Sequence, residues 1–155
     1  MSNQPAIKGL YNVLSDTYAL TIKTHNYHWN VEGASFASLH QLFETQYNDL
    51  FEATDMLAER MRALDSKVNG GLAAFAKASS IADGDASLTA EQMIEDLYDG
   101  HQRVLAAIEK AADAAEKAED DATADLLTER RAAHEKAAWM LKSCLPKTQQ
   151  LKKTA

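Results

Sequence analysis

Residues 24–40 read THNYHWNVEGASFASLH, and an interruption of the helical pattern inside this stretch separates the first two predicted helices. Apolar side chains recur at helical spacing on both sides of it, which predicts long helices over about residues 5–30 and 36–64. The segment VEGAS, residues 31–35, interrupts the pattern, and Ser35 can cap the second helix. The same stretch holds three histidines and a tryptophan, which either pack in a core or lie near a metal.

Two more helices follow at the same spacing. The segment TAEQ places Thr89 and Gln92 three residues apart, which is typical of a capping box at the start of a helix, and that helix is expected to run to about residue 115. A fourth helix is expected over about residues 122–145, because Pro146 cannot continue it.

The connection between the second and third helices, residues 65–87, is long for a compact domain. We expect it to cross the bundle and to contain a short helix near residues 72–77. This order of elements predicts an all-α fold, a ferritin-like four-helix bundle with a short extra helix in the long middle connection. The bundle is expected to occupy residues 1–146, and residues 147–155 a short basic C-terminal tail.

Composition narrows the class of protein. The 155 residues suit one domain. The N-terminus lacks a basic segment followed by an apolar run, and no apolar stretch reaches 18 residues, so we expect a cytoplasmic protein with no membrane span. The single cysteine, Cys144, excludes an internal disulfide and is expected to be a small buried side chain. A net charge of −7 argues against nucleic-acid binding through the body of the protein.

The second predicted helix carries a polar stripe. Its members lie at about 0°, 40°, 60° and 100° around the helix axis, at 100° per residue; they are His40, Glu44, Asp55 and Glu59. His40 and Asp55 are fifteen residues apart, or about 22 Å along the helix. Metal–ligand bonds are about 2 Å long, so these two side chains cannot hold one ion within a single chain.

A second copy of the helix, running antiparallel alongside, removes this difficulty. The pairs 40/44 and 55/59 are symmetric about a point between Asp49 and Leu50, so a two-fold axis there would create two equivalent sites between subunits. This interpretation requires that the residues are metal ligands. Two polar pairs at this spacing are also common on a solvated helix face, where Glu59 could lie near Arg62, and a lone His40 could be a satisfied structural histidine.

Three segments resemble the Dps family, the DNA-binding proteins from starved cells, also called mini-ferritins. They are HWNVEGASFASLHQLFE (28–44), ATDMLAERMRAL (53–64) and DDATADLLTERRAAHEKAAWMLKSCL (120–145), and the last resembles the final helix of the family. The resemblance implies a hollow homododecamer of four-helix subunits. It also implies a ferroxidase that oxidises Fe(II), preferably with hydrogen peroxide, at di-iron centres on two-fold interfaces and stores the ferric mineral inside.

The resemblance also implies a set of metal ligands, which are His28, His40, Glu44, Asp55 and Glu59. On this assignment Asp55 and Glu59 hold the tighter iron with His28, and His40 and Glu44 complete the second position. The family usually has Asp where this chain has Glu44, whose extra methylene is expected to change the affinity for the weaker iron. His25, one turn before His28, is either an extra ligand or a surface histidine.

The chemistry needs this mixture of donors, since carboxylates and neutral imidazole suit Fe(II), and carboxylates stay bound to Fe(III). Two ferrous ions held together can give both electrons to one peroxide molecule, whereas a lone ion gives one electron and releases hydroxyl radical. Trp29 follows a ligand directly. In the family such a tryptophan is thought to intercept stray oxidising equivalents, and a large core aromatic is the alternative; Trp139 is expected to be core.

Other acids suggest how iron enters and where mineral forms. The acids near the start of the last helix match residues that line three-fold pores in the family, Asp121 and Asp125 best, followed by Glu116 and Asp120. Acids are favoured at a helix N-terminus in any case, so simple capping is the alternative. Three acids of the second helix could seed mineral on the inner wall: Glu44, Asp49 and Glu52.

Two rival functions remain. One is a DNA-compacting protein that uses the lysines of its C-terminal tail, Lys147, Lys152 and Lys153. Against it, only Lys8 precedes Lys23 at the N-terminus, and twelve copies would carry about −84 (12 × −7), which repels phosphate. The tail could equally be solubilising disorder. The other rival is a helical scaffold without metal function. The expected function is iron detoxification and storage, with Fe(II) and hydrogen peroxide or dioxygen as substrates, which protects DNA from oxidative damage.

Overall fold

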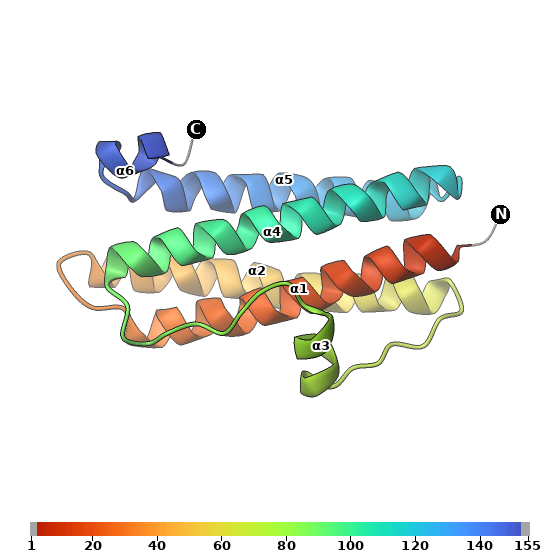
Figure 1. Cartoon of the computed structure of the whole chain (residues 1–155), viewed down its shortest axis with the longest axis horizontal. Coiled ribbons are helices and arrows are strands. Elements are labelled where there is room, and N and C mark those ends of the chain that lie inside the picture. The colour runs from red at the N-terminus through yellow and green to blue at the C-terminus, as the bar shows by residue number, and fades with distance from the viewer. Residues whose placement is uncertain (1–2, 153–155) are drawn as a thin grey trace.

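The computed structural model describes residues 3–152, and within them the chain is helical with no strand. The helices are α1 Gln4–Asn30, α2 Phe36–Ala63, α3 Leu72–Ala78, α4 Ala90–Lys117, α5 Asp121–Ser143 and α6 Lys147–Lys152. Four of them are long and lie side by side as a bundle, while the short α3 lies on its flank (Figure 1). The predicted all-α fold with a short helix in the middle connection is confirmed.

The bundle consists of two helical hairpins. α1 packs against α2, α4 packs against α5, and the hairpins meet mainly where α1 contacts α4. The connection that follows α2 passes through α3, which packs on α1, and then runs back along the bundle to the start of α4 (Figure 1). α1 and α4 therefore form one layer, with α2 and α5 on the other side of it.

Hydrogen bonds fasten the middle connection to this layer. The carboxylate of Asp16 accepts a bond of 2.6 Å from the Ser80 amide and one of 2.9 Å from the Ser79 hydroxyl. Further along, the Tyr27 hydroxyl donates to Asp96 and accepts from the Asp85 amide at 3.2 Å. Burial, followed by the hydrogen bond to Asp96, raises the pKa of Tyr27, so the phenol stays protonated and keeps donating.

Capping explains some helix boundaries. The predicted capping box is present: the Gln92 amide donates to the Thr89 hydroxyl at 3.2 Å, and the Thr89 amide donates to the Gln92 side chain at 2.9 Å. Ser35 does occupy the N-cap position of α2, but its side chain makes no capping hydrogen bond. Asp120 caps α5 by accepting from the Thr123 amide at 3.1 Å.

The core consists mainly of apolar side chains, but two residues expected to be buried are not in it. Trp139 is 64% exposed, and the thiol of Cys144 is also exposed. In α5 the buried side is marked by Ala138 and Leu141, and Trp139 is rotated about 100° from Ala138. The helix geometry thus turns the indole away from the core, and both expectations were wrong.

Gly9 sets the distance between α1 and α4. A Cβ at this position would lie 2.8 Å from the Ala111 Cβ and 2.9 Å from its Cα. We expect Gly9→Ala to lower the free energy of unfolding by about 2 kcal/mol, because the overlap with backbone outweighs the roughly 1 kcal/mol that alanine adds as the better helix former. Urea unfolding of the assembled protein measures this difference.

The control is Gly70→Ala, since a Cβ at Gly70 meets nothing within 4 Å. Its free energy of unfolding should stay within about 0.5 kcal/mol of wild type. Equal stability of the two variants would mean that α1 can shift away from α4 at little cost.

Candidate metal centre

The turn between α1 and α2 brings His28 and His40 into direct contact. The Nδ1 of His28 lies 2.7 Å from the His40 carbonyl oxygen, and the Nδ1 of His40 lies 2.7 Å from the His28 carbonyl oxygen. The rings stack with their centroids 3.7 Å apart and their planes 16° apart. Because a carbonyl oxygen only accepts, each Nδ1 must carry a proton, and in the neutral ring Nε2 then keeps its lone pair.

This arrangement is what a pair of metal-binding imidazoles requires. A ligating histidine usually donates its second ring N–H to a carbonyl or carboxylate, which fixes both the tautomer and the ring orientation. His28 is buried and His40 is half-buried. Neither Nε2 makes a hydrogen bond within residues 3–152, so both lone pairs are available to an incoming ion.

An aromatic cluster borders the two histidines. The His25 ring lies 3.9 Å from the Trp29 ring and 4.3 Å from the Tyr47 ring, between centroids, and 6.0 Å from His28. Burial, and then the positive charge that His28 can carry, lower the pKa of His25. His25 is therefore held between two rings and is only half-exposed. The indole of Trp29 is 64% exposed, so within a single chain it is not a core aromatic.

The predicted carboxylate ligands lie along α2. Glu44 is exposed one turn after His40, and Asp55 and Glu59 are exposed further along the helix. Asp55 lies about 22 Å from His40 by helix rise. Within the described residues, no three His, Cys, Asp or Glu side chains lie close enough to hold one ion. A single chain thus brings His28 and His40 together and leaves Asp55 and Glu59 apart from them.

Two large apolar side chains of α2 are exposed, and one of them lies on the face of the polar stripe. Phe51 is 57% exposed and Met56 38% exposed, and Phe51 lies about 20° around the helix from His40, inside the polar stripe. Both residues line a pocket of about 690 Å³ together with Asp55 and Phe75. Exposed apolar side chains that line one pocket are typical of an interface with another chain.

The acids near the start of α5 have different surroundings. Asp120 accepts a bond of 2.7 Å from the Arg60 guanidinium, which ties the end of α2 to the start of α5. Burial acts to raise the pKa of Asp120, but the hydrogen bonds from Thr123 and the charge of Arg60 together lower it. The other acids predicted to line a pore are exposed: Glu116, Asp121 and Asp125.

The proposed nucleation acids also differ from one another. Asp49 forms a two-pronged ion pair with the buried Arg130, with N–O distances of 2.8 and 3.2 Å. Glu44 and Glu52 are exposed, and within residues 3–152 neither forms an ion pair. Two of the three carboxylates therefore face solvent without a cationic partner among these residues.

A buried histidine pair is the feature that sequence reasoning missed. The Nδ1 atoms of His101 in α4 and His134 in α5 lie 2.8 Å apart, and each residue is 1% exposed. Their Nε2 atoms have no partner within the described residues. Burial lowers the pKa of His101 to about 4 and that of His134 well below its usual value. A signal was present, because both histidines fall on the apolar stripes of their helices.

The described part of the C-terminal tail is helical. α6 places Lys147 and Lys152 on the surface, whereas Lys153 lies outside the described residues. The Gln149 side chain donates to Glu91 at 3.2 Å and so links α6 to the first turn of α4. None of the helices that the structure describes is both long enough and apolar enough to cross a bilayer.

Comparison with known proteins agrees with this architecture. The ferritin-like domain family matches residues 7–151. General stress protein 20U of Bacillus subtilis is 33% identical over 94% of this chain and 99% of its own length. DNA protection during starvation protein 2 of Bacillus anthracis is 33% identical over 92% of this chain and 98% of its own.

Solved structures of Dps proteins are also similar to this chain. Dps from Staphylococcus aureus has a TM-score of 0.90 and 32% identity, covering 94% of this chain and 97% of its own. A Dps protein from Bacillus brevis has a TM-score of 0.88 and 32% identity, covering 94% of this chain and 100% of its own. With the family match and these relatives over nearly its whole length, the chain belongs to the Dps proteins of the ferritin-like family.

Proposed function

We propose that this protein takes up Fe(II), oxidises it at centres shared between two copies of the chain, and stores the ferric product inside a hollow homododecamer. By removing Fe(II) and peroxide from the cytoplasm, it protects DNA from oxidative damage. Relatives named for DNA protection support this proposal, as does a Dps protein of Vibrio cholerae described as a member of the ferritin-like diiron-carboxylate superfamily. The observation that carries it is the stacked pair His28 and His40, with both Nε2 lone pairs available.

The exposed face of α2 supplies the argument for a shared centre. A two-fold axis near Asp49 and Leu50 sets His40 and Glu44 of one copy against Asp55 and Glu59 of a second copy. Phe51 is within two residues of this midpoint, so the same contact covers a phenyl ring that is 57% exposed in the single chain. Hydrophobic burial and ligand geometry thus favour the same antiparallel pairing.

In the proposed reaction, each of two Fe(II) ions gives one electron to a single hydrogen peroxide molecule. The O–O bond breaks, two protons are taken up, and the products are two Fe(III) ions and two water molecules. Asp55 and Glu59 hold the tighter iron with His28, while His40 and Glu44 complete the second position. The carboxylates keep Fe(III) bound because hard oxygen donors suit it. Trp29 has an oxidisable indole ring beside His25. It intercepts oxidising equivalents that escape from the iron centre.

In this proposal, exposed acidic side chains guide the entry of Fe(II) and the growth of the ferric mineral. Fe(II) enters past Asp121 and Asp125, with Glu116 nearby, and mineral forms at Glu44 and Glu52. Asp49 contributes less, because the Arg130 guanidinium already neutralises its carboxylate.

DNA compaction is the second candidate function. The observation that favours it is the pair of exposed lysines on α6, Lys147 and Lys152, in a helix without acids, with Lys153 following in sequence. A gel shift at low salt, with and without residues 146–155, distinguishes it: the absence of retardation in both forms eliminates this function.

The test of iron oxidation is the double substitution Asp55→Ala plus Glu59→Ala. After anaerobic loading with Fe(II) and a pulse of hydrogen peroxide, we expect the ferric absorbance to rise only at the uncatalysed rate, since the tighter iron position loses both of its carboxylate ligands and two Fe(II) ions are no longer held together. The assembled protein is the sample, and size-exclusion chromatography checks that assembly persists.

The matched control is Glu109→Ala plus Asp113→Ala, which removes two exposed carboxylates at the same spacing on α4. This variant should oxidise iron at the wild-type rate. If the Asp55 and Glu59 double variant is equally fast, the ligand assignment is wrong, whatever the fold.

A further inference from the structure

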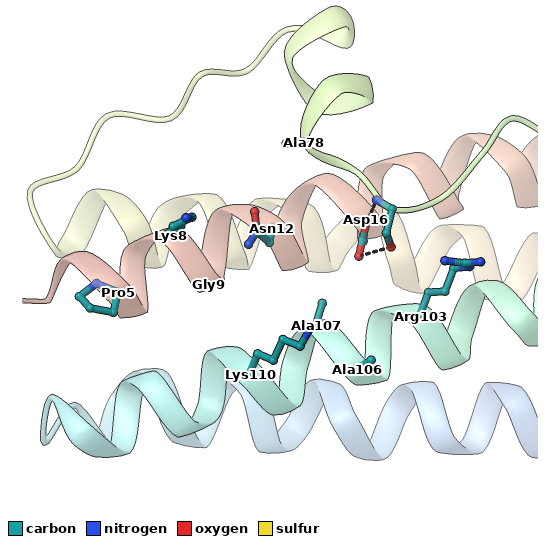
Figure 2. Close-up of a pocket in the computed structure, with 11 residues that line it drawn as sticks. Pro5, Lys8, Gly9, Asn12, Asp16, Ala78, Arg103, Ala106, Ala107 and Lys110 are labelled. Carbon is teal, nitrogen blue, oxygen red and sulfur yellow. Dashed lines mark hydrogen bonds between the residues drawn. The ribbon is translucent and has the colours of Figure 1, made fainter.

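A groove runs between α1 and α4 (Figure 2). Its volume is about 520 Å³. Small residues from both helices line it, including Gly9, Ala106 and Ala107. Since these residues present almost no side chain, the groove stays open although the two helices approach closely at Gly9.

Basic side chains from both helices border this groove. Lys8 comes from α1, and Arg103 and Lys110 come from α4 (Figure 2). Arg103 and Lys110 are seven residues apart, which is about two helical turns and about 10 Å along the axis. Both side chains therefore start from the same side of α4, on the wall that faces α1. All three are exposed, and within residues 3–152 none forms an ion pair with a carboxylate. Their charges therefore remain available to a ligand.

One carboxylate also lines the groove, but it is already engaged. Asp16 is 3% exposed, and its oxygens accept three hydrogen bonds from Ser79 and Ser80. Asn12, beside it, adds an exposed amide that can donate. The border of the groove thus has an excess of positive charge, in a chain whose net charge is −7. Such a local reversal of sign attracts anions to one place on the surface.

We propose that this groove binds a small anion that carries phosphate. Lysine and arginine are the usual partners of phosphate oxygens, and charge-assisted hydrogen bonds from them are among the strong ones. The volume falls within the range of small-molecule sites, and the small residues of the floor let a flat organic group approach the backbone. Three cations are too few for tight binding of a long polyanion to a body of net negative charge. The site shares no residue with the proposed iron centre, so either proposal can fail alone.

Calorimetric titration of the assembled, metal-free protein with ATP, and separately with inorganic phosphate, tests this proposal. We expect saturable binding of one ATP per chain at low salt. The double variant Lys8→Gln plus Lys110→Gln should weaken it at least about tenfold, because two charge-assisted contacts are lost. Arg103→Gln, a second variant on the same wall, should weaken it as well. Stronger binding of ATP than of phosphate would identify an organic phosphate, and equal binding would identify free phosphate; both support the site.

The control is Lys117→Gln plus Lys136→Gln, which removes the same charge from exposed lysines outside the groove. ATP affinity should remain at the wild-type value in this variant, and circular dichroism should show wild-type helix content in all four proteins. The proposal is overturned by an absence of saturable binding, by equal weakening in the control, or by binding of a short DNA duplex when neither ATP nor phosphate binds.

Discussion

Mixing two inactive variants of this protein is expected to restore about one quarter of the wild-type rate of iron oxidation. One variant carries His40→Ala plus Glu44→Ala, and the other carries Asp55→Ala plus Glu59→Ala. Each alone should be inactive, because every shared centre then lacks one half of its ligands. In a mixed pair, one centre combines both damaged halves and the other combines both intact halves.

The expected fraction follows from this symmetry. Random association makes about half of the pairs mixed, and each mixed pair has one working centre of two, which gives about one quarter of the full number. The experiment unfolds the two variants together, refolds them, and measures the ferric absorbance after a peroxide pulse. Variants that are refolded separately and then combined are the control and should stay inactive. No recovery in well-assembled mixed protein would show that the ligands do not come from two chains.

Acidification is expected to destabilise the bundle through its buried histidine pair. Burial lowers the pKa of His101 to about 4, whereas in the unfolded chain it titrates near 6.5. The unfolded chain therefore binds more protons between these values. The stabilisation is complete above pH 6.5 and is lost as the pH falls toward 4, by about 3 kcal/mol for His101 alone. His134, whose pKa is also lowered by burial, acts in the same direction.

Urea unfolding of the assembled protein at a series of pH values measures this loss. Two charged groups act on His101: Asp49 acts to raise its pKa, and Arg130 acts to lower it. The variant His101→Leu plus His134→Met replaces both partners by apolar side chains and should flatten the pH dependence between 6.5 and 4. The same slope in this variant and in wild type would show that other groups cause the acid sensitivity.

Most of the fold could be predicted because its signals are local. Helical periodicity, the capping box at Thr89 and the stop at Pro146 placed the four long helices within a few residues of their ends. α6 was missed, since six residues after a proline carry little periodic signal. The exposure of Trp139 was also missed, although its position one residue after Ala138 already placed it off the buried stripe.

Part of the candidate site could be predicted from helix geometry. Helix rise alone shows that His40 and Asp55 cannot meet within one chain, and the structure keeps them on separate turns of α2. The reciprocal bonds between His28 and His40 were not predictable, because they depend on the backbone path through residues 31–35. Whether a second copy covers Phe51 is a property of two chains, which the periodicity of one chain does not contain.

The crossed bonds between His28 and His40 have a consequence for mutagenesis. Each imidazole is oriented by the main chain of the other residue, so the two rings form one mechanical unit that closes the helical hairpin. Replacing either histidine by alanine removes one ring and the stacking contact, but it leaves the main-chain carbonyl that accepts the hydrogen bond of the other ring. A single replacement at this hairpin therefore removes one imidazole while the other keeps its tautomer and its hydrogen bond, so the contributions of the two histidines can be measured separately.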